Sequence, residues 1–138
     1  MISIIDSNIW IYYFDQASQQ NKSVAEYLNT MLRKDQAAVT SVISVEVVHY
    51  LFRRLGTAEG YEKAKIFHMG PIKTLEFTSL DLPAHLEKMR QTAHLGIGGR
   101  DATILVCMER EGIDTIVTHD KSFQYVESLK VVDPVSLE

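Results

Sequence analysis

The chain has 138 residues, of which 46% are hydrophobic and 23% are charged. That length suits one domain, and that apolar content supplies a buried core, so an intrinsically disordered chain is excluded. The formal net charge is −4 at pH 7, which excludes nucleic-acid binding through bulk positive charge, so that any such site has to be local.

The cysteine content and the chain start predict a cytoplasmic protein. The single cysteine, Cys107, cannot form a disulfide within the chain, which is typical of a reducing compartment. The first six residues contain no basic stretch and reach an acid at Asp6, unlike a secretory signal. No apolar run approaches the roughly 20 residues needed to span a bilayer. We therefore expect neither a signal peptide nor a membrane span.

The first half of the chain predicts two strands, two helices and one ambiguous segment. Short apolar runs predict buried strands over residues 2–5 and 37–40. Helices are expected over residues 7–14 and 21–34. Segment 42–55 is rich in β-branched residues, which favour a strand, but its length and the glycine that follows it favour a helix.

The second half continues the alternation of helices and strands. Asp81 is expected to cap a helix that has Pro83 in its first turn. The predicted elements are helices over 57–69, 82–95 and 100–111, strands over 72–77, 114–118 and 131–132, and a turn or short helix from residue 120. Alternating strands and helices predict one α/β domain over residues 1–138, with a mostly parallel central sheet and helices on both faces.

Three aspartates stand at predicted helix starts. Asp6 and Asp120 each follow a predicted strand, and Asp101 follows the glycine-rich break at residues 96–99. Helix capping explains each of them singly, because aspartate is a favoured N-cap residue. In an open parallel sheet, however, ligands bind beyond the carboxyl ends of the strands, where Asp6 and Asp120 both fall.

Convergence of these acids predicts a bound cation. Two carboxylates about 4 Å apart repel by about 4 kcal/mol at an effective dielectric constant near 20, so a proton or a cation has to relieve them. The candidate ligands are all oxygen donors, without the Cys and His residues of a zinc site. Such a donor set favours a hard ion, and we expect Mg²⁺ or Mn²⁺.

Glu46 is a fourth candidate acid, and its role stays open on the sequence alone. It lies in a strongly apolar stretch, where a free surface acid is less natural. The functional interpretation places it with the three aspartates. The alternative is a solvated helix face, on which Glu46 pairs with Arg53 or Arg54.

Two cations and one aromatic segment have similarly divided interpretations. Arg100 and Lys121 each adjoin a candidate acid, so they are possible RNA contacts through phosphate, or else surface ion pairs of little energetic weight. The aromatic residues within segment 10–14 are expected in the core, although an exposed ring could stack on a base or a partner subunit.

Four segments of the chain resemble the PIN domain family, in particular the small VapC-type toxin ribonucleases of type II toxin–antitoxin systems. Ile4–Asn8 is similar to the family's first strand and first acid, and Ser41–Glu46 to its serine-then-glutamate helix. Gly99–Leu105 is similar to the segment with the third acid, and Thr118–Phe123 to the closing threonine, aspartate and phenylalanine. The four occur in the family's order and span nearly the whole chain.

The resemblance implies that the protein is a metal-dependent ribonuclease. The catalytic acids would be Asp6, Glu46, Asp101 and Asp120, of which Asp6, Asp101 and Asp120 would be the metal ligands. The polar side chains supporting them would be Ser7, Asn8 and Thr118. The resemblance also implies RNA as substrate, a homodimer and a cognate antitoxin whose tail covers the acidic site. The apolar and aromatic residues of the first predicted helices could supply the dimer interface.

Other functions remain as alternatives. A dehalogenase-like phosphatase typically has a second acid two residues after the first, where this chain has Asn8. A receiver domain usually has an adjacent acidic pair after its first strand, which is also missing. A PIN-like module that binds RNA or protein without cleavage stays open, as does a housekeeping RNA-processing nuclease.

Overall fold

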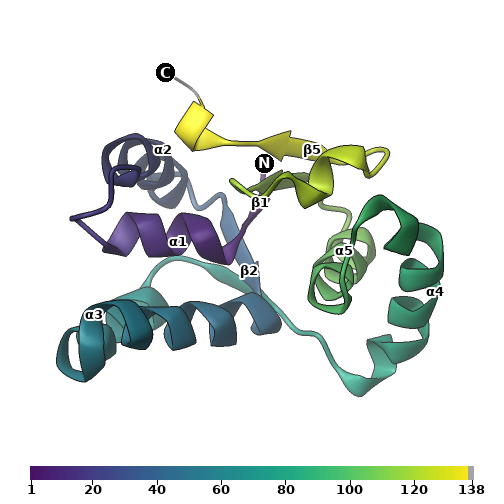
Figure 1. Ribbon diagram of the computed structural model, residues 1–138, viewed down its shortest axis with the longest axis horizontal. Helices are drawn as coiled ribbons and strands as arrows, with labels where there is room; N and C mark the ends of the chain where they lie inside the picture. Colours follow the sequence, from purple (N-terminus) through teal and green to yellow (C-terminus); the bar gives the residue numbers. More distant parts are fainter. Residues whose placement is uncertain (137–138) are drawn as a thin grey trace.

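Five short parallel strands form one sheet at the centre of the molecule (Figure 1). The strands are β1 (Ser3–Ile5), β2 (Ala37–Thr40), β3 (Lys73–Leu75), β4 (Thr115–Val117) and β5 (Lys130–Val132). Their order is β3-β2-β1-β4-β5, and each neighbouring pair is parallel. The computed structural model describes residues 1–136, so residues 137–138 of the predicted domain lie outside the described residues.

Helices cover both faces of this sheet. The α-helices are α1 (Ser7–Phe14), α2 (Asn21–Arg33), α3 (Ser41–Met69), α4 (Leu82–Thr92) and α5 (Gly99–Glu111). The 3₁₀-helices are η1 (Ser79–Asp81), η2 (Ala93–Leu95), η3 (Lys121–Tyr125) and η4 (Pro134–Ser136). Within residues 1–136, none of the helices has the length and apolar character to cross a membrane.

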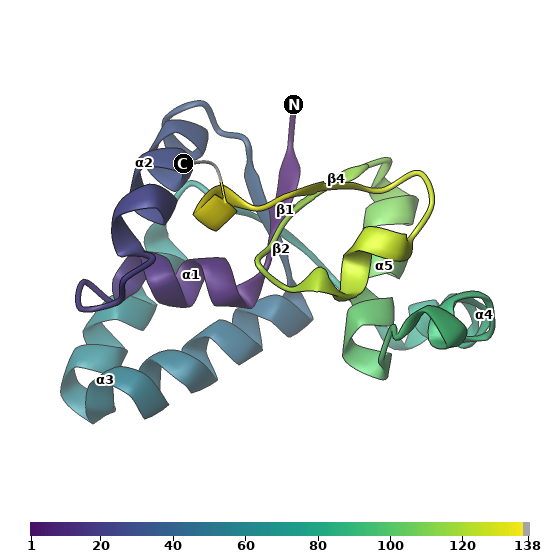
Figure 2. The same cartoon turned by 45° about the horizontal axis from the view of Figure 1, so that its top comes forward.

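The order of the strands explains this arrangement. The chain moves from β1 to β2 and β3, and then crosses back to β4 on the other side of β1. Because parallel crossovers are right-handed, helices before and after this reversal lie on opposite faces. Helices α1, α2 and α3 accordingly lie on one side of the strands and α4 and α5 on the other (Figures 1 and 2). The predicted fold class is confirmed.

The inner strands are apolar because both of their faces are covered. Ile4 of β1 pairs with Ala38 of β2 and Ile116 of β4, and all three side chains are fully buried. The following residues Ile5 and Val117 are fully buried too. A strand buried on both faces reads as a continuous apolar run instead of alternating polarity, which is why these short segments could be recognised as strands.

Trp10 anchors α1 in the core directly behind the end of β1. Its side chain is 1% exposed, and its indole Nε1 donates a hydrogen bond to the Ile5 carbonyl oxygen at 3.2 Å. Its ring centroid lies 5.0 Å from that of Phe67 and 6.3 Å from that of Phe14. Trp10 and Phe14 thus lie in the core, as predicted for the aromatic segment, whereas Tyr12 and Tyr13 are half-buried against it.

The segments expected as two helices over 42–55 and 57–69 are the two helical arms of α3, which meet at a sharp kink. Gly56 departs from helical geometry, with φ 83° and ψ 174°, and marks the bend. Beyond it, Gly60 packs so closely that an added Cβ would lie 2.8 Å from the Phe52 Cα. The ambiguity over residues 42–55 is thereby resolved as helix, since tertiary packing overrides the strand preference of β-branched residues.

Asp81 stands at the predicted N-cap position of α4, but its carboxylate is used elsewhere. Asp81 precedes α4 but makes no side-chain cap to it. It accepts instead from the Thr78 backbone nitrogen at 2.9 Å and pairs with Arg110 of α5 at 2.6 Å. The helix expected to reach Leu95 also ends earlier, since residues 93–95 tighten into η2 before Gly96 adopts a left-handed φ of 89°.

Candidate active site

A cleft of about 620 Å³ opens beyond the carboxyl ends of β1 and β4. These two strands are neighbours, but the connections that follow them run to opposite sides of the sheet. Such a reversal leaves a crevice at the strand ends, which is where α/β proteins bind ligands. Asp6 follows β1 and Asp120 follows β4, and both line this cleft.

Asp6 is held rigidly at the base of the cleft. Its side chain is 1% exposed. One carboxylate oxygen, Oδ1, accepts from the Ser7 backbone nitrogen at 2.8 Å, which caps α1. The other, Oδ2, accepts from the Thr118 hydroxyl at 2.8 Å. Capping therefore does operate at Asp6, but it uses only part of the hydrogen-bonding capacity of this carboxylate.

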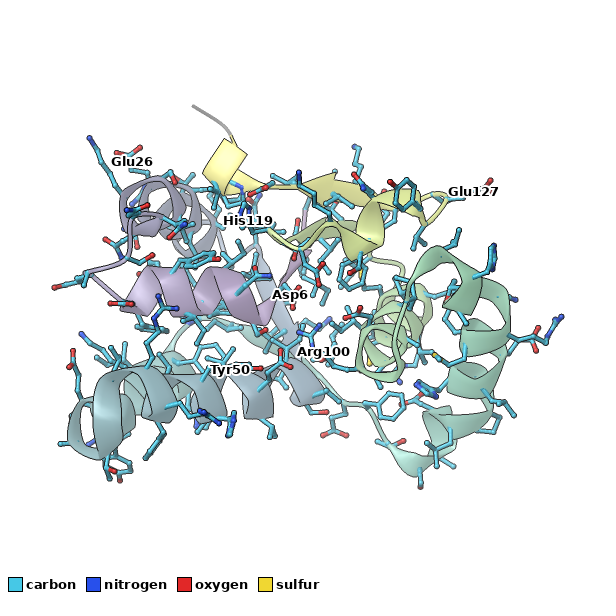
Figure 3. The ribbon with its side chains drawn as sticks, in the orientation of Figure 1. Asp6, Glu26, Tyr50, Arg100, His119 and Glu127 are labelled. Carbon is cyan, nitrogen blue, oxygen red and sulfur yellow. The ribbon has the colours of Figure 1, made fainter. Side chains whose placement is uncertain are left out.

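The guanidinium of Arg100 lies at the centre of three carboxylates. Its Nη2 is 2.5 Å from Asp6 Oδ1 and 2.5 Å from Glu46 Oε1, and its Nη1 is 2.7 Å from Asp101 Oδ1. Nε donates to Glu46 Oε2 at 2.9 Å, and Nη2 also reaches the Ser7 hydroxyl at 3.2 Å. Figure 3 shows Asp6 and Arg100 in the space between α1, α3 and α5.

The electrostatics of this cluster follow from its charges. Burial by itself would lower the pKa of Arg100, but the adjacent carboxylates of Asp6 and Glu46 outweigh it and raise the pKa. Burial raises the pKa of Asp101; Arg100 opposes this rise, and the negative charges of Asp120 and Asp6 add to it. Burial is therefore the main reason that the pKa of Asp101 is raised, and repulsion from the neighbouring carboxylates adds a smaller part.

A polar network behind the acids links the ends of β1 and β4. The Thr118 hydroxyl accepts from the Asp120 backbone nitrogen at 3.0 Å and from Asn8 Nδ2 at 3.3 Å. Asn8 Oδ1 accepts from the His119 backbone nitrogen at 3.2 Å. Asp120 Oδ1 accepts from the backbone nitrogen and hydroxyl of Ser122, capping η3. The network fixes the relative positions of the two strand ends.

The structure brings together nearly all the residues singled out from the sequence. Those lining the cleft or bonded directly to its acids are Asp6, Ser7, Asn8, Glu46, Arg100, Asp101, Thr118 and Asp120. Lys121 is the exception: it is exposed and stands outside the set of described residues that line the cleft. Its predicted contact with RNA therefore gains no support from the geometry.

The surface interpretation of Glu46 is wrong. Glu46 pairs with Arg100, which is 54 positions away in the sequence, in place of Arg53 or Arg54. Arg54 pairs with Asp15 at the end of α1, at 2.8 Å. Glu46 is thus drawn into the cleft by a long-range ion pair that local sequence spacing cannot indicate.

Sequence reasoning did not assign the wall of the cleft beyond the acids, apart from allowing an exposed ring in segment 10–14 to stack on a base. Tyr12 of α1 and Tyr50, Arg53 and Arg54 of α3 also line it. The spacing places Tyr50 and Arg53 on the helix face of Glu46, since residues separated by three or four positions share one face of a helix. It does not indicate that this face lines a cleft. That stripe covers roughly 10 Å, at about 1.5 Å per residue.

A comparison with known families decides which family this is. The model of the PIN domain family matches residues 3–129. The chain belongs to the PIN domain family. Among curated proteins, no relative of this PIN domain was found by sequence.

Solved structures share the fold of this PIN domain at low sequence identity. VapC20 of Mycobacterium tuberculosis, described as a sarcin–ricin loop cleaving toxin, has a TM-score of 0.78 and 15% identity over 94% of this chain and 98% of that one. VapBC2 of Rickettsia felis, bound to a promoter DNA fragment, has a TM-score of 0.75 and 20% identity. The match covers 95% of this chain and 97% of that one. A toxin–antitoxin complex of Klebsiella pneumoniae has a TM-score of 0.68 and 15% identity. The match covers 96% of this chain and 97% of that one.

The donor set of this PIN domain fits a hard divalent metal, although the guanidinium lies in its way. Carboxylate and hydroxyl oxygens converge in the cleft, and oxygen donors suit Mg²⁺ or Mn²⁺. Within residues 1–136, no three acidic, histidine or cysteine side chains stand arranged as ligands of one ion. Arg100 lies between the carboxylates, at the centre of this donor set.

Proposed function

We propose that this PIN domain is a divalent-metal-dependent ribonuclease and the toxin of a toxin–antitoxin pair. The observation that carries the proposal is the convergence of acids from four separate elements on one cleft. Capping accounts for Asp6 and Asp120, but it gives Glu46, in the interior of α3, no reason to approach Asp6. Carboxylates that are held close together repel one another, and a bound cation relieves that repulsion. Clusters of such ionisable groups in a cleft often mark functional sites.

The residues of the chain would divide the work between holding the ion and orienting its ligands. Asp6, Asp101 and Asp120 would hold Mg²⁺ or Mn²⁺, and Glu46 would complete the catalytic set. When bound, such an ion supplies an activated water and a clamp for the phosphate. Thr118, whose hydroxyl bonds Asp6 Oδ2 at 2.8 Å, would fix the orientation of that ligand.

Cleavage of RNA should require the metal. Purified protein incubated with a mixed RNA pool in Mg²⁺ or Mn²⁺ is expected to produce fragments, and excess EDTA is expected to stop the reaction. Restoring the ion should restore cleavage, because the ligands are oxygen donors that bind hard cations reversibly. The readout is the fragment pattern on a denaturing gel.

The same assay separates the candidates. Cleavage that continues undiminished in excess EDTA contradicts the metal dependence. The guanidinium of Arg100 at the centre of the acids is the one observation that favours a module that binds RNA without cutting it. Retention of intact RNA by the protein, without fragments in either metal, would establish that second candidate.

The wall of α3 offers a path for an RNA strand leaving the acids. Tyr50 is 46% exposed and lines the cleft, where its ring can stack on a base. Arg53, one turn further, is exposed, and within residues 1–136 its side chain has no hydrogen bond or ion pair. A free guanidinium at this position suits contact with a phosphate.

Arg53→Gln is therefore expected to weaken RNA binding more than Arg54→Gln. Both substitutions remove one positive charge from the same wall, but Arg54 is already paired with Asp15. Loss of one phosphate contact should lower the salt dependence of binding by about one charge equivalent. Fluorescence anisotropy with a labelled RNA over a salt series measures this, and equal effects of the two variants would contradict it.

An antitoxin, a homodimer and a cytoplasmic location complete the proposal. The cleft is open, so the tail of a partner could cover it, and Cys107 is buried as a free thiol. The first helices offer little for a dimer, because their large apolar side chains are mostly buried. Exposed apolar side chains stand instead on η1 and α4, where Leu80 is 88% and Leu86 74% exposed.

A further inference from the structure

We propose that Arg100 is a built-in counter-cation of the acidic cluster, which competes with the divalent metal for the same carboxylates. The inference rests on the proposed metal site and adds a residue that controls access to it. Arg100 then holds the acids in place and has to withdraw before an ion binds.

The contacts of Arg100 satisfy the cluster as a cation would. All three guanidinium nitrogens are used, by Asp6, Glu46 and Asp101, at distances of 2.5 to 2.9 Å. Arginine alone among the cationic side chains presents a planar fork that can bridge several carboxylates at once. Arg100 is therefore built into the site in a way that an incidental surface ion pair is not.

A guanidinium and a metal ion cannot both occupy this position. Mg²⁺ binds its oxygen ligands at about 2.1 Å in near-octahedral geometry. An ion held by the oxygens of Asp6 and Asp101 that Arg100 contacts would compete with its Nη atoms for those oxygens. One positive charge also leaves three carboxylates under-neutralised, whereas a divalent ion neutralises them further, so the metal has an electrostatic advantage in the exchange.

The position of Arg100 allows it to withdraw without unfolding. It lies in the first turn of α5, directly after Gly98 and Gly99, and both glycines border open space. Its side chain is 29% exposed and lines the open cleft. A change of side-chain rotamer therefore carries the guanidinium toward solvent while α5 keeps its place.

The test compares Mn²⁺ affinity of the wild type with that of Arg100→Gln, measured by isothermal titration calorimetry without RNA. If the withdrawn state of Arg100 is populated at about one tenth or less, the variant should bind Mn²⁺ about tenfold more tightly or better. Arg53→Gln is the matched control, because it removes one positive charge from the same cleft but breaks no contact of the cluster. Removing any positive charge from the cleft raises its affinity for cations, and the control variant measures that general effect.

A second measurement is the melting temperature of each variant. With EDTA present, Arg100→Gln should melt at a lower temperature than wild type, since the three carboxylates repel without their counter-cation. Saturating Mn²⁺ should close that gap. Should the glutamine variant fail to fold, Arg100→Lys takes its place: its compact ammonium cannot bridge three carboxylates, so it should also bind Mn²⁺ more tightly than wild type.

The outcomes distinguish the two proposals. Mn²⁺ binding that is measurable in wild type but no tighter in Arg100→Gln than in Arg53→Gln overturns the role of Arg100 and leaves the metal site intact. Absence of Mn²⁺ binding in wild type and in all variants overturns the metal site itself, and the competition with it. A gain confined to the Arg100 variants supports the inference.

Discussion

Asp6→Asn is expected to lower RNA cleavage by at least about 100-fold, because even residues that merely support metal ligands change activity by about 10–100-fold when replaced. Asparagine keeps the size of the side chain and caps a helix about as well as aspartate. The hydrogen bond from the Ser7 nitrogen can therefore persist. The charge that would bind the metal is lost, so the ion and the water it activates are lost with it.

The stability of Asp6→Asn separates this explanation from misfolding. The variant loses the ion pair with Arg100 but also relieves repulsion among the acids. These effects oppose each other, so we expect the free energy of unfolding to fall by less than the roughly 3–5 kcal/mol that breaking a buried ion pair alone costs. Mn²⁺ should raise the melting temperature of wild type and have little effect on the variant.

A control for Asp6→Asn lies at the other end of the same helix. Asp15 is a second largely buried aspartate and pairs with Arg54, outside the acidic cluster. Asp15→Asn should retain cleavage. Asp101→Asn and Asp120→Asn should behave like Asp6→Asn, and near-normal cleavage by all three would remove the basis for the site.

Trp10→Ala is expected to have the largest effect on stability, lowering the free energy of unfolding by about 3–5 kcal/mol. The substitution opens a cavity among the rings of Phe14 and Phe67. It also leaves the Ile5 carbonyl oxygen without its indole donor. Because domains of this kind are stable by only about 5–15 kcal/mol, the loss is a large share of the total.

Urea unfolding monitored by circular dichroism measures this change. Tyr125→Ala provides the comparison, since Tyr125 is 63% exposed and its truncation should stay within about 0.5 kcal/mol. A loss below about 1 kcal/mol in Trp10→Ala would show that α1 is held to the sheet by other contacts. Since Ile5 directly precedes Asp6, reduced metal affinity should accompany the lost stability.

Local sequence determined the elements of this protein and the position of two of its acids. Continuous apolar runs identified the buried strands, and their ends placed Asp6 and Asp120 at the carboxyl edge of the sheet. These features are readable because strand burial and helix starts depend on residues a few positions apart. The resemblance to the PIN domain family added Glu46 and Asp101 as members of the same set.

Tertiary structure alone decided which side chains meet in the cleft. The reversal of strand order around β1 brings Asp120 beside Asp6, and the crossing of α3 and α5 brings Glu46 against Arg100. Lys121 lies only one residue beyond Asp120, yet the described lining of the cleft does not include it. In the sequence Arg100 and Lys121 are equivalent in this respect, because each adjoins a candidate acid. Which cation enters a cluster of carboxylates depends on contacts between residues far apart in the chain, and such contacts exist only once the sheet and its helices have assembled.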